Sequence, residues 1–146
     1  MSDNSLTIEI VVPYSPEQVF NAVTNVRGWW NEEIDGGTTD VGDEFIFNDN
    51  SLMSRFRLTE VTPERVVWQV LDSDLDFVED RHEWTDTQVT FDITRTPDGT
   101  NLRFTHHGLR PTVECYEACS RGWDFYINQS LKNLVTVGTG QPIPKP

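Results

Sequence analysis

Basic residues are scarce in this chain. Its 146 residues include eleven lysines and arginines against twenty-four aspartates and glutamates, so the formal net charge at pH 7 is −13. A surface of this charge repels phosphate backbones and anionic membranes. We therefore expect neither nucleic acid nor a membrane as a partner, and we attribute the acidity itself to solubility.

Long apolar runs, cysteines and targeting signals are equally scarce. No stretch approaches the roughly 20 apolar residues that span a bilayer, and the opening MSDNSLTIEI lacks the basic and apolar regions of a secretion signal. With only two cysteines, the sequence favours a reducing, cytoplasmic location. No repeat or linker interrupts the chain, which predicts a single domain over residues 1–146.

The first part of the sequence predicts one strand and two short helices. The segment SLTIEIVV at 5–12 alternates and ends in β-branched residues, as strands do. The next helix has Ser15 as N-cap, Pro16 at its first position and Gln18 to complete a capping box. VRGWWNEE then predicts a second short helix.

Residues 44–107 show the pattern of antiparallel strands. EFIF, SRFRLTEV, RVVWQVL, TQVTFDITR and TNLRFTHH alternate or run apolar, and turn residues separate them. FVEDRHEW, between the third and fourth of these, predicts a further short strand. The outward-facing Arg55 and Arg57 are expected to pair with acidic residues on adjacent strands.

A long amphipathic helix follows these strands. Thr112 is its expected N-cap and Gly138 its stop, which leaves 139–146 as a mobile tail. Between them, apolar residues recur at spacings of three and four and form a stripe on one face. About 25 helical residues extend roughly 37 Å. Since the sheet must bury one face, this helix is the element that covers it.

The stretch RFTHHGLRPTVECYEACSRGW resembles a metal site at first sight. Adjacent strand residues point to opposite faces, so His106 and His107 cannot easily bind one metal, and zinc needs three or four converging ligands. Cβ atoms of Cys115 and Cys119, one helical turn apart, are about 5–6 Å apart, against roughly 3.5–4.5 Å in a disulfide. We therefore expect no metal and two free thiols. A catalytic thiolate, for which Cys115 is better placed, is the further alternative.

The segments together resemble one family by their order. They are SPEQVFNAVT after an opening strand, then WW, a G…G-D-x-F-x-F segment (Gly37, Gly42, Phe45, Phe47), FRLTEVTPERVVWQV, EWTDTQVTFDI, GTNLRFTHHGL and GWDFYINQSLKNLVTVGTG. Over residues 6–140 the chain is similar to the START-like (SRPBCC) superfamily. Within it, the sequence most resembles homologues of the activator of heat-shock-protein-ninety ATPase.

The resemblance implies an α+β fold of the helix-grip (START-like, Bet v 1-like) type. In it, a curved antiparallel sheet wraps around a long C-terminal α-helix, and two short helices follow the first strand. Relatives enclose a cavity between sheet and helix, where superfamily members bind hydrophobic small molecules and some run cyclisations or dehydrations. The chaperone activators instead contact the chaperone and carry an additional N-terminal domain, which we do not expect here. A fold alone does not fix function.

Alternation along the strands and the helix selects the side chains that face this space. The candidate ligand-binding residues are Trp30, Phe45, Phe47, Phe56, Trp68, Trp84, Phe91, Phe104, His106, Tyr116, Trp123, Tyr126 and Ile127. Most of them are expected to be core, and the others to line an aromatic pocket. His106, Tyr116 and Tyr126 are its expected polar groups.

Two positions leave alternatives open. His106 is either held by one backbone hydrogen bond without a further role, or contacts a ligand, or transfers protons near neutral pH as the candidate catalytic residue. Trp29 and Trp30 are adjacent, and adjacent helical positions face different ways. One of them is therefore expected in the core and the other nearer the surface, where it is either structural or forms an aromatic lip over an entrance.

Three hypotheses for function follow. The first is a domain that binds a small, largely apolar or aromatic molecule without a cofactor or metal. The second is a cofactor-independent cyclase or dehydratase that uses His106 as acid or base. The third is interaction with a chaperone or another protein.

Overall fold

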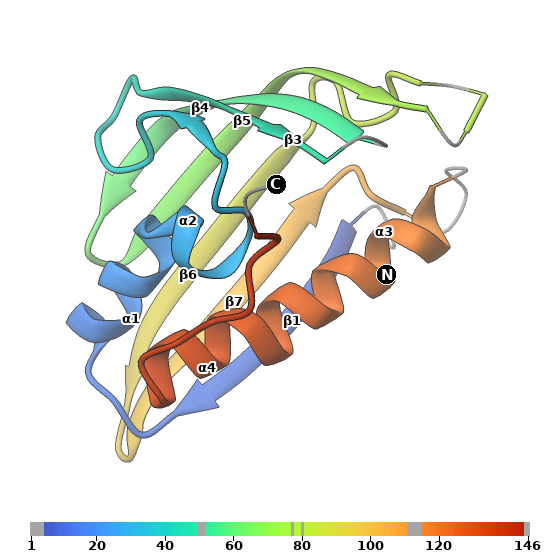
Figure 1. Cartoon of the computed structure of the whole chain (residues 1–146). Coiled ribbons are helices and arrows are strands. Elements are labelled where there is room, and N and C mark those ends of the chain that lie inside the picture. Colours follow the sequence, from blue (N-terminus) through green and yellow to red (C-terminus); the bar gives the residue numbers. More distant parts are fainter. Residues whose placement is uncertain (1–4, 50–51, 77, 80, 111–114, 145–146) are drawn as a thin grey trace.

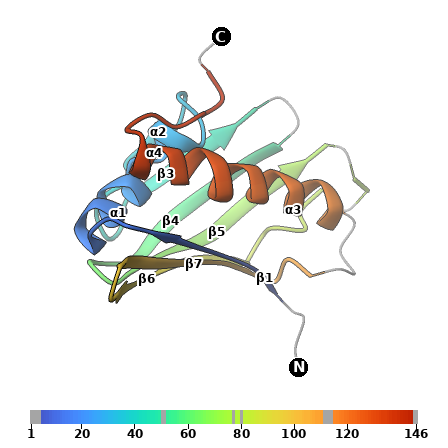
Figure 2. The same ribbon diagram turned by 90° about the horizontal axis from the view of Figure 1, so that it is seen from below.

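The fold has two layers, a twisted antiparallel sheet and a long helix that lies across one of its faces (Figures 1 and 2). The computed structural model describes residues 5–49, 52–76, 78–79, 81–110 and 115–144. Within them, a seven-stranded sheet has the order β1-β7-β6-β5-β4-β3-β2. The strands are β1 Ser5–Val12, β2 Asp35–Gly36, β3 Glu44–Asn48, β4 Leu52–Thr62, β5 Arg65–Leu75, β6 Gln88–Thr96 and β7 Gly99–His107. The predicted α+β helix-grip fold is confirmed.

Curvature of the sheet is concentrated in β4. Its register with β5 shifts between Arg55 and Phe56 and again between Leu58 and Glu60. Such bulges bend a strand and increase its twist. The inward side chains of β3, β4 and β5 are consequently turned toward the helix, and Phe56 and Leu58 are fully buried.

The first helices form as the sequence predicts. In α1, Pro16–Thr24, the Ser15 side chain accepts from the backbone N–H of Gln18, and the Gln18 side chain accepts from the Ser15 N–H. Helix α2, Val26–Trp29, is a single turn. Both helices lie at one end of the sheet, beside the last turns of the C-terminal helix (Figure 2).

The C-terminal helix consists of three consecutive segments. They are α3 Tyr116–Phe125, a wider π-helical segment η1 Tyr126–Leu131, and α4 Lys132–Thr136. The predicted cap at Thr112 lies outside the described residues, and Cys115 precedes the first helical turn without a capping hydrogen bond from its side chain. Gly138 ends the helix with φ +91°, and its N–H donates to Asn133 O.

The segment after the helix turns back toward α2. Ile143 N donates to Trp30 O at 2.9 Å, and Glu32 N donates to Ile143 O at 2.9 Å. At Gly140, a Cβ atom would lie 2.3 Å from Gly28 O, so only glycine permits this approach. Gln141 and Ile143 are thus hydrogen-bonded to η1 and to the residues at and after the end of α2, while the expected mobility of the tail stays a prediction.

The predicted short strand in FVEDRHEW is wrong for its described residues 78–79 and 81–84, which form bends and turns. Directly after this segment, Asp86 has φ +72°, a left-handed conformation, so the chain turns again before β6 begins. Leu75 N donates to Arg81 O and the His82 ring nitrogen Nδ1 donates to Ser73 O. The segment therefore folds back on the end of β5, and this brings Trp84 over the sheet.

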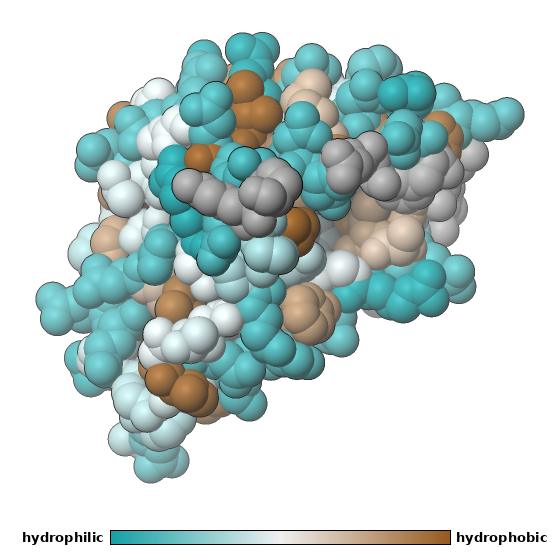
Figure 3. Space-filling model, in the orientation of Figure 1, coloured by the Kyte–Doolittle hydropathy of each residue, from teal (hydrophilic) through white to brown (hydrophobic). Residues whose placement is uncertain are grey.

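The outer face of the sheet carries charged side chains in pairs. As expected, Arg55 and Arg57 both pair with Glu44 on the adjacent strand, and Arg103 pairs with Glu9. On the side of the molecule seen in Figure 3, hydrophilic residues predominate and hydrophobic ones form small separate patches. In the part of the chain that the structure describes, no helix has the length and apolarity that a membrane span requires.

Candidate functional site

The space between the sheet and the helix is largely filled by aromatic rings. Trp68 of β5 lies at the centre of this cluster, with ring centroids 4.9 Å from Phe91, 5.1 Å from Phe45 and 5.3 Å from Phe56. Trp29 stacks on Trp68 from the side of α2, at 6.2 Å and 11°. This end of the molecule is a solid aromatic core.

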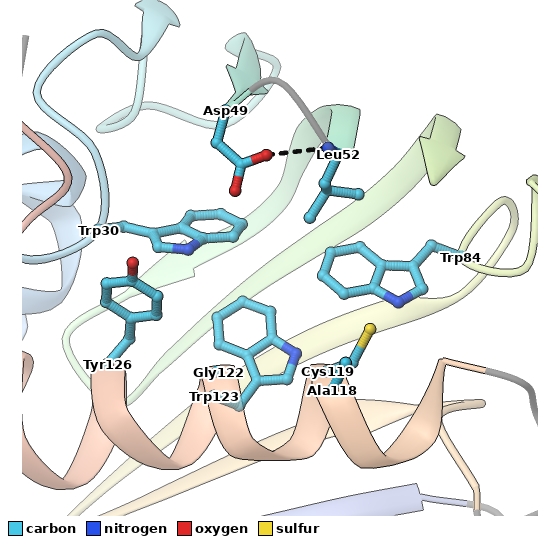
Figure 4. A pocket seen from close by; sticks show the side chains of 9 residues that line it. All are labelled: Trp30, Asp49, Leu52, Trp84, Ala118, Cys119, Gly122, Trp123 and Tyr126. Atoms are coloured by element: carbon cyan, nitrogen blue, oxygen red, sulfur yellow. Dashed lines mark hydrogen bonds between the residues drawn. The ribbon is translucent and has the colours of Figure 1, made fainter. Parts of the chain in front are cut away.

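A cavity of about 150 Å³ opens at the other end of the helix, between α3 and the ends of β3 and β4 (Figure 4). It is lined by Trp30, Asp49, Leu52, Trp84, Ala118, Cys119, Gly122, Trp123 and Tyr126. Pockets for drug-sized ligands measure roughly 300–1,000 Å³, whereas an apolar cavity of about 150 Å³ holds a molecule such as benzene. The space therefore suits a single ring or one end of a longer molecule.

Small residues on the helix create this cavity. Ala118, Cys119 and Gly122 face it from α3, beside Trp123 of the same helix, while Trp30 and Trp84 border it from outside the helix. A Cβ atom added at Gly122 would meet no heavy atom within 4 Å. A larger side chain at this position would occupy the space, so the cavity depends on the absence of side-chain volume on one turn of α3.

The two adjacent tryptophans differ from the prediction. Neither lies near the surface: Trp29 is 0% and Trp30 3% exposed, and their rings stack at 6.0 Å and 12°. The physical reason is that α2 ends here, with Trp30 as its C-cap, and that Ile143 of the returning tail covers the side that solvent would otherwise reach. Trp30 reaches the cavity as an inner wall.

His106 is part of a closed hydrogen-bond chain. The Trp123 indole Nε1 donates to His106 Nδ1 at 3.1 Å. An indole nitrogen only donates, so Nδ1 is the acceptor and the ring hydrogen of the neutral histidine is on Nε2. Nε2 then donates to the Thr87 hydroxyl at 2.9 Å, which donates to Trp84 O at 2.6 Å.

This arrangement holds His106 in its neutral form. The ring is fully buried, and burial lowers the pKa of His106 to about 3, with a smaller contribution from His107. His106 does not line the cavity. Its two bonds hold Trp123 and, through Thr87, the backbone of Trp84, so the histidine positions two walls of the cavity from behind.

Six of the lining residues carry polar side-chain atoms, namely Trp30, Asp49, Trp84, Cys119, Trp123 and Tyr126. Trp84 Nε1 is buried and has no hydrogen-bond partner, although the Cys119 sulfur lies beside it. A hydrogen bond with Cys115 and burial raise the pKa of the Cys119 thiol well above its ordinary value. Burial, followed by the charge of Asp49, raises the pKa of Tyr126. Both groups are therefore protonated near neutral pH.

Neither cysteine has the setting of a catalytic thiolate or a metal ligand. Both are buried and unlinked. The Cys115 backbone N–H donates to Glu83 Oε1 at 3.0 Å, which places an acidic group at the first turn of α3. Among the described residues, no three His, Cys, Asp or Glu side chains converge in a group that would hold a metal ion.

The structure divides the candidate site residues into three groups. Trp30, Trp84, Trp123 and Tyr126 line the cavity. Tyr116 is half-buried against the core, outside the lining. The remaining candidates are buried in the core, namely Phe45, Phe47, Phe56, Trp68, Phe91, Phe104, His106 and Ile127. A ligand-binding role for any of them stays a prediction.

Sequence reasoning missed five lining residues: Asp49, Leu52, Ala118, Cys119 and Gly122. One of them carries a usable signal, because an isolated glycine inside a helical pattern costs stability and is retained for packing or function. Asp49 gives no such signal, since it follows β3 in the NDN segment and has the composition of an ordinary turn.

Comparisons with known proteins bear on the fold and the family. The family model described as activator of Hsp90 ATPase homolog 1-like protein matches residues 13–136. No curated protein matches the chain significantly. Among solved structures, the Aha1 dimer from Colwellia psychrerythraea is 26% identical, with a TM-score of 0.75, over 93% of this chain and 98% of that chain.

Two further structures share the fold at lower identity. A protein from Mesorhizobium loti is 21% identical, with a TM-score of 0.71, over 94% of this chain and 99% of that one. A protein from Chromobacterium violaceum is 20% identical, with a TM-score of 0.66, over 90% and 97%. Together with the family match, these findings establish that the chain belongs to the family of activator of Hsp90 ATPase homolog 1-like proteins, within the START-like superfamily.

Proposed function

We propose that this chain binds a small, largely apolar molecule in the cavity between the sheet and α3. The observation that carries the proposal is a half-open, aromatic-walled cavity of about 150 Å³ beside a close-packed core. Protein interiors contain few voids larger than a water molecule. A cavity lined by three indoles, with a few polar groups among them, is the expected form of a ligand pocket.

The walls of this pocket are fixed before a ligand enters. Trp30 stacks on Phe47 at 4.2 Å, and Trp123 packs on Phe104 at 4.6 Å while it donates to His106. Such preorganisation supports affinity, because little side-chain entropy is lost when a ligand binds. The solid core thus acts as the support for the pocket.

Substitution of Gly122 tests the proposal. Gly122→Leu would place a side chain into the cavity, whereas Gly122→Ala adds a single methyl group as the matched control. Both variants and the wild type are purified from the native cells and measured by mass spectrometry under non-denaturing conditions. We expect a bound small molecule in the wild type and its loss in Gly122→Leu. A species that Gly122→Leu retains would place binding elsewhere and contradict the proposal.

The enzyme hypothesis receives no support from the position of His106. An acid or base must reach the reacting atoms and titrate near the working pH. His106 lies behind Trp123 with both ring nitrogens bonded, and its pKa is lowered to about 3. No other observation at the cavity favours proton transfer over binding.

A chaperone-related interaction is the second candidate function, and the family match is the observation that favours it. It is tested by adding the purified chain to an Hsp90-type chaperone and measuring ATP hydrolysis. If this function holds, stimulation survives Gly122→Leu but fails when surface charges are reversed. If the pocket is the functional site, the chain does not stimulate the chaperone or does so only with its ligand bound.

A further inference from the structure

The cavity contains one charged group. Of the nine residues that the structure places around it, Asp49 alone carries a formal charge, and it is negative. Its carboxylate is held in place, since Oδ1 accepts from the Leu52 backbone N–H at 2.8 Å. Figure 4 shows the second carboxylate oxygen directed toward Trp30 and the cavity.

Aromatic rings surround the same space. The Trp30 and Trp123 centroids are 4.9 Å apart, and Trp84 stacks on Trp123 at 5.8 Å and 12°, so three indoles form one continuous wall. Tyr126 extends it toward Asp49 (Figure 4). The faces of aromatic rings carry partial negative charge and attract cations, most strongly in the case of tryptophan.

The field of Asp49 reaches into this space. Burial raises the pKa of Tyr126, and the negative charge of Asp49, which lines the same cavity, raises it further. A neutral ligand that filled the pocket would further desolvate this half-buried carboxylate without replacing the lost hydration, which is unfavourable. A cation would offset that loss. The net charge of −13 also attracts cations to the molecule as a whole.

We infer that the pocket selects a small organic cation of the substituted-ammonium class, with its alkyl groups against the indoles and its charge beside Asp49. This inference rests on the proposed function and specifies the ligand class of the same cavity. An alkylated ammonium is apolar on its surface and positive as a whole, and it therefore suits a lining of four aromatic rings and one carboxylate.

The test compares two probes of nearly the same shape. Choline carries a trimethylammonium group, and dimethylbutanol carries a neutral carbon in place of the nitrogen. Binding of each is followed by the fluorescence of the tryptophans that line the cavity. Cation–π contacts and the carboxylate together should make choline bind about tenfold or more tightly than dimethylbutanol, and added salt should reduce the difference.

Variants identify the groups that cause the preference for choline over dimethylbutanol. Asp49→Asn retains an oxygen that accepts from Leu52 and should remove most of the preference for choline. Asp98→Asn, an exposed residue in the β6–β7 turn at the opposite end of the sheet, is the matched control and should leave the preference unchanged. Tyr126→Phe keeps the ring and should retain choline binding, whereas Tyr126→Leu should weaken it.

The outcomes separate the inference from the proposed function. If dimethylbutanol binds as tightly as choline, or if Asp49→Asn keeps the preference, the inference is overturned while binding of an apolar molecule stands. If neither probe binds and Gly122→Leu behaves as the wild type, the pocket itself is refuted and the inference fails with it.

Discussion

The two ends of the space between sheet and helix are built from the same residue types in different ways. Around Trp68, rings pack on rings, and Trp29, Phe45, Phe56 and Phe91 leave no room between them. Around Trp123, equally large rings line a cavity. The difference lies on the helix, which presents Ile127 and Leu131 to the solid end and Ala118, Cys119 and Gly122 to the open one.

The comparison of the two ends shows that aromatic content does not by itself indicate a pocket. A hollow needs a deficit of volume opposite the rings and a rigid support that prevents the rings from collapsing into it. Here the support is the hydrogen-bond chain through His106 together with the solid core. The measurements below test whether the two ends differ in this way.

The largest loss of stability is expected when a substitution creates a cavity in the solid end. Trp68→Ala should lower the free energy of unfolding by about 5 kcal/mol, at the upper end of the range for such truncations. Trp84→Ala should lower it by only about 3 kcal/mol, because that ring already borders empty space. Urea denaturation of both variants measures the difference. Equal losses would show that the two ends are packed alike.

The free energy of unfolding is expected to depend on pH through His106, which supports the walls of the open end. The pKa of His106 is about 3 in the folded chain against an ordinary value of 6.5. Between these pH values the unfolded state therefore binds a proton that the folded state does not bind. Its contribution to stability is complete above pH 6.5 and is lost as pH falls toward 3. Between pH 6.5 and about 4.5, this amounts to roughly 2 kcal/mol.

The matched variant for this effect is His106→Gln. It removes the titrating ring, keeps one donor and one acceptor for Thr87 and Trp123, and leaves the carboxylates of the chain unchanged. Stability curves of wild type and variant should converge by roughly 2 kcal/mol over this pH range. Parallel curves would mean that His106 is protonated in the folded chain.

A smaller effect is expected where the tail meets the solid end. The Ser130 hydroxyl is buried, donates to Trp29 O at 2.6 Å and accepts from Gln141 N at 2.7 Å. Ser130→Ala should cost about 1.5 kcal/mol and release the returning segment. Amide exchange should then accelerate at Gln141 and Ile143 but not in the β6–β7 hairpin. Unchanged exchange at both residues would show that Ser130 does not hold the tail.

The smallest effect has the opposite sign and belongs to the open end. Gly122→Ala replaces the poorest non-proline helix former by the best one, and its methyl group meets no atom within 4 Å. The free energy of unfolding should rise by about 1 kcal/mol, visible as a higher Tm. Destabilisation would show that α3 is closer to the opposite wall than the cavity implies.

Much of the fold follows from local patterns in the sequence. The capping box at Ser15 and Gln18, the alternation in β3 to β7 and the stop at Gly138 each predict an element that the structure contains. These predictions succeed because caps, turns and strand alternation depend on neighbours within a few residues. The predicted strand in FVEDRHEW fails because its composition does not reveal that the chain turns back to the end of β5, where Arg81 O and the His82 ring bond to Leu75 and Ser73.

The candidate site was only partly predictable for the same reason. Alternation correctly turns Trp68, Phe91 and Phe104 inward, but an inward direction does not distinguish a packed ring from a wall of a cavity. That distinction depends on what lies opposite each ring, and the opposing residue is far away in the chain. Trp84, for example, meets residues of α3 more than thirty positions later.

By itself, therefore, the sequence determined the order of elements, the helix-grip fold and the set of buried aromatic side chains. Only the tertiary structure decided where the interior is left empty, that both ring nitrogens of His106 are hydrogen-bonded behind Trp123, and that Asp49 lines the same cavity as four aromatic rings. Hydrophobic patterning is a property of single segments. A cavity and its electrostatics arise from the volumes and charges of segments brought together, because these are fixed only when the chain has packed.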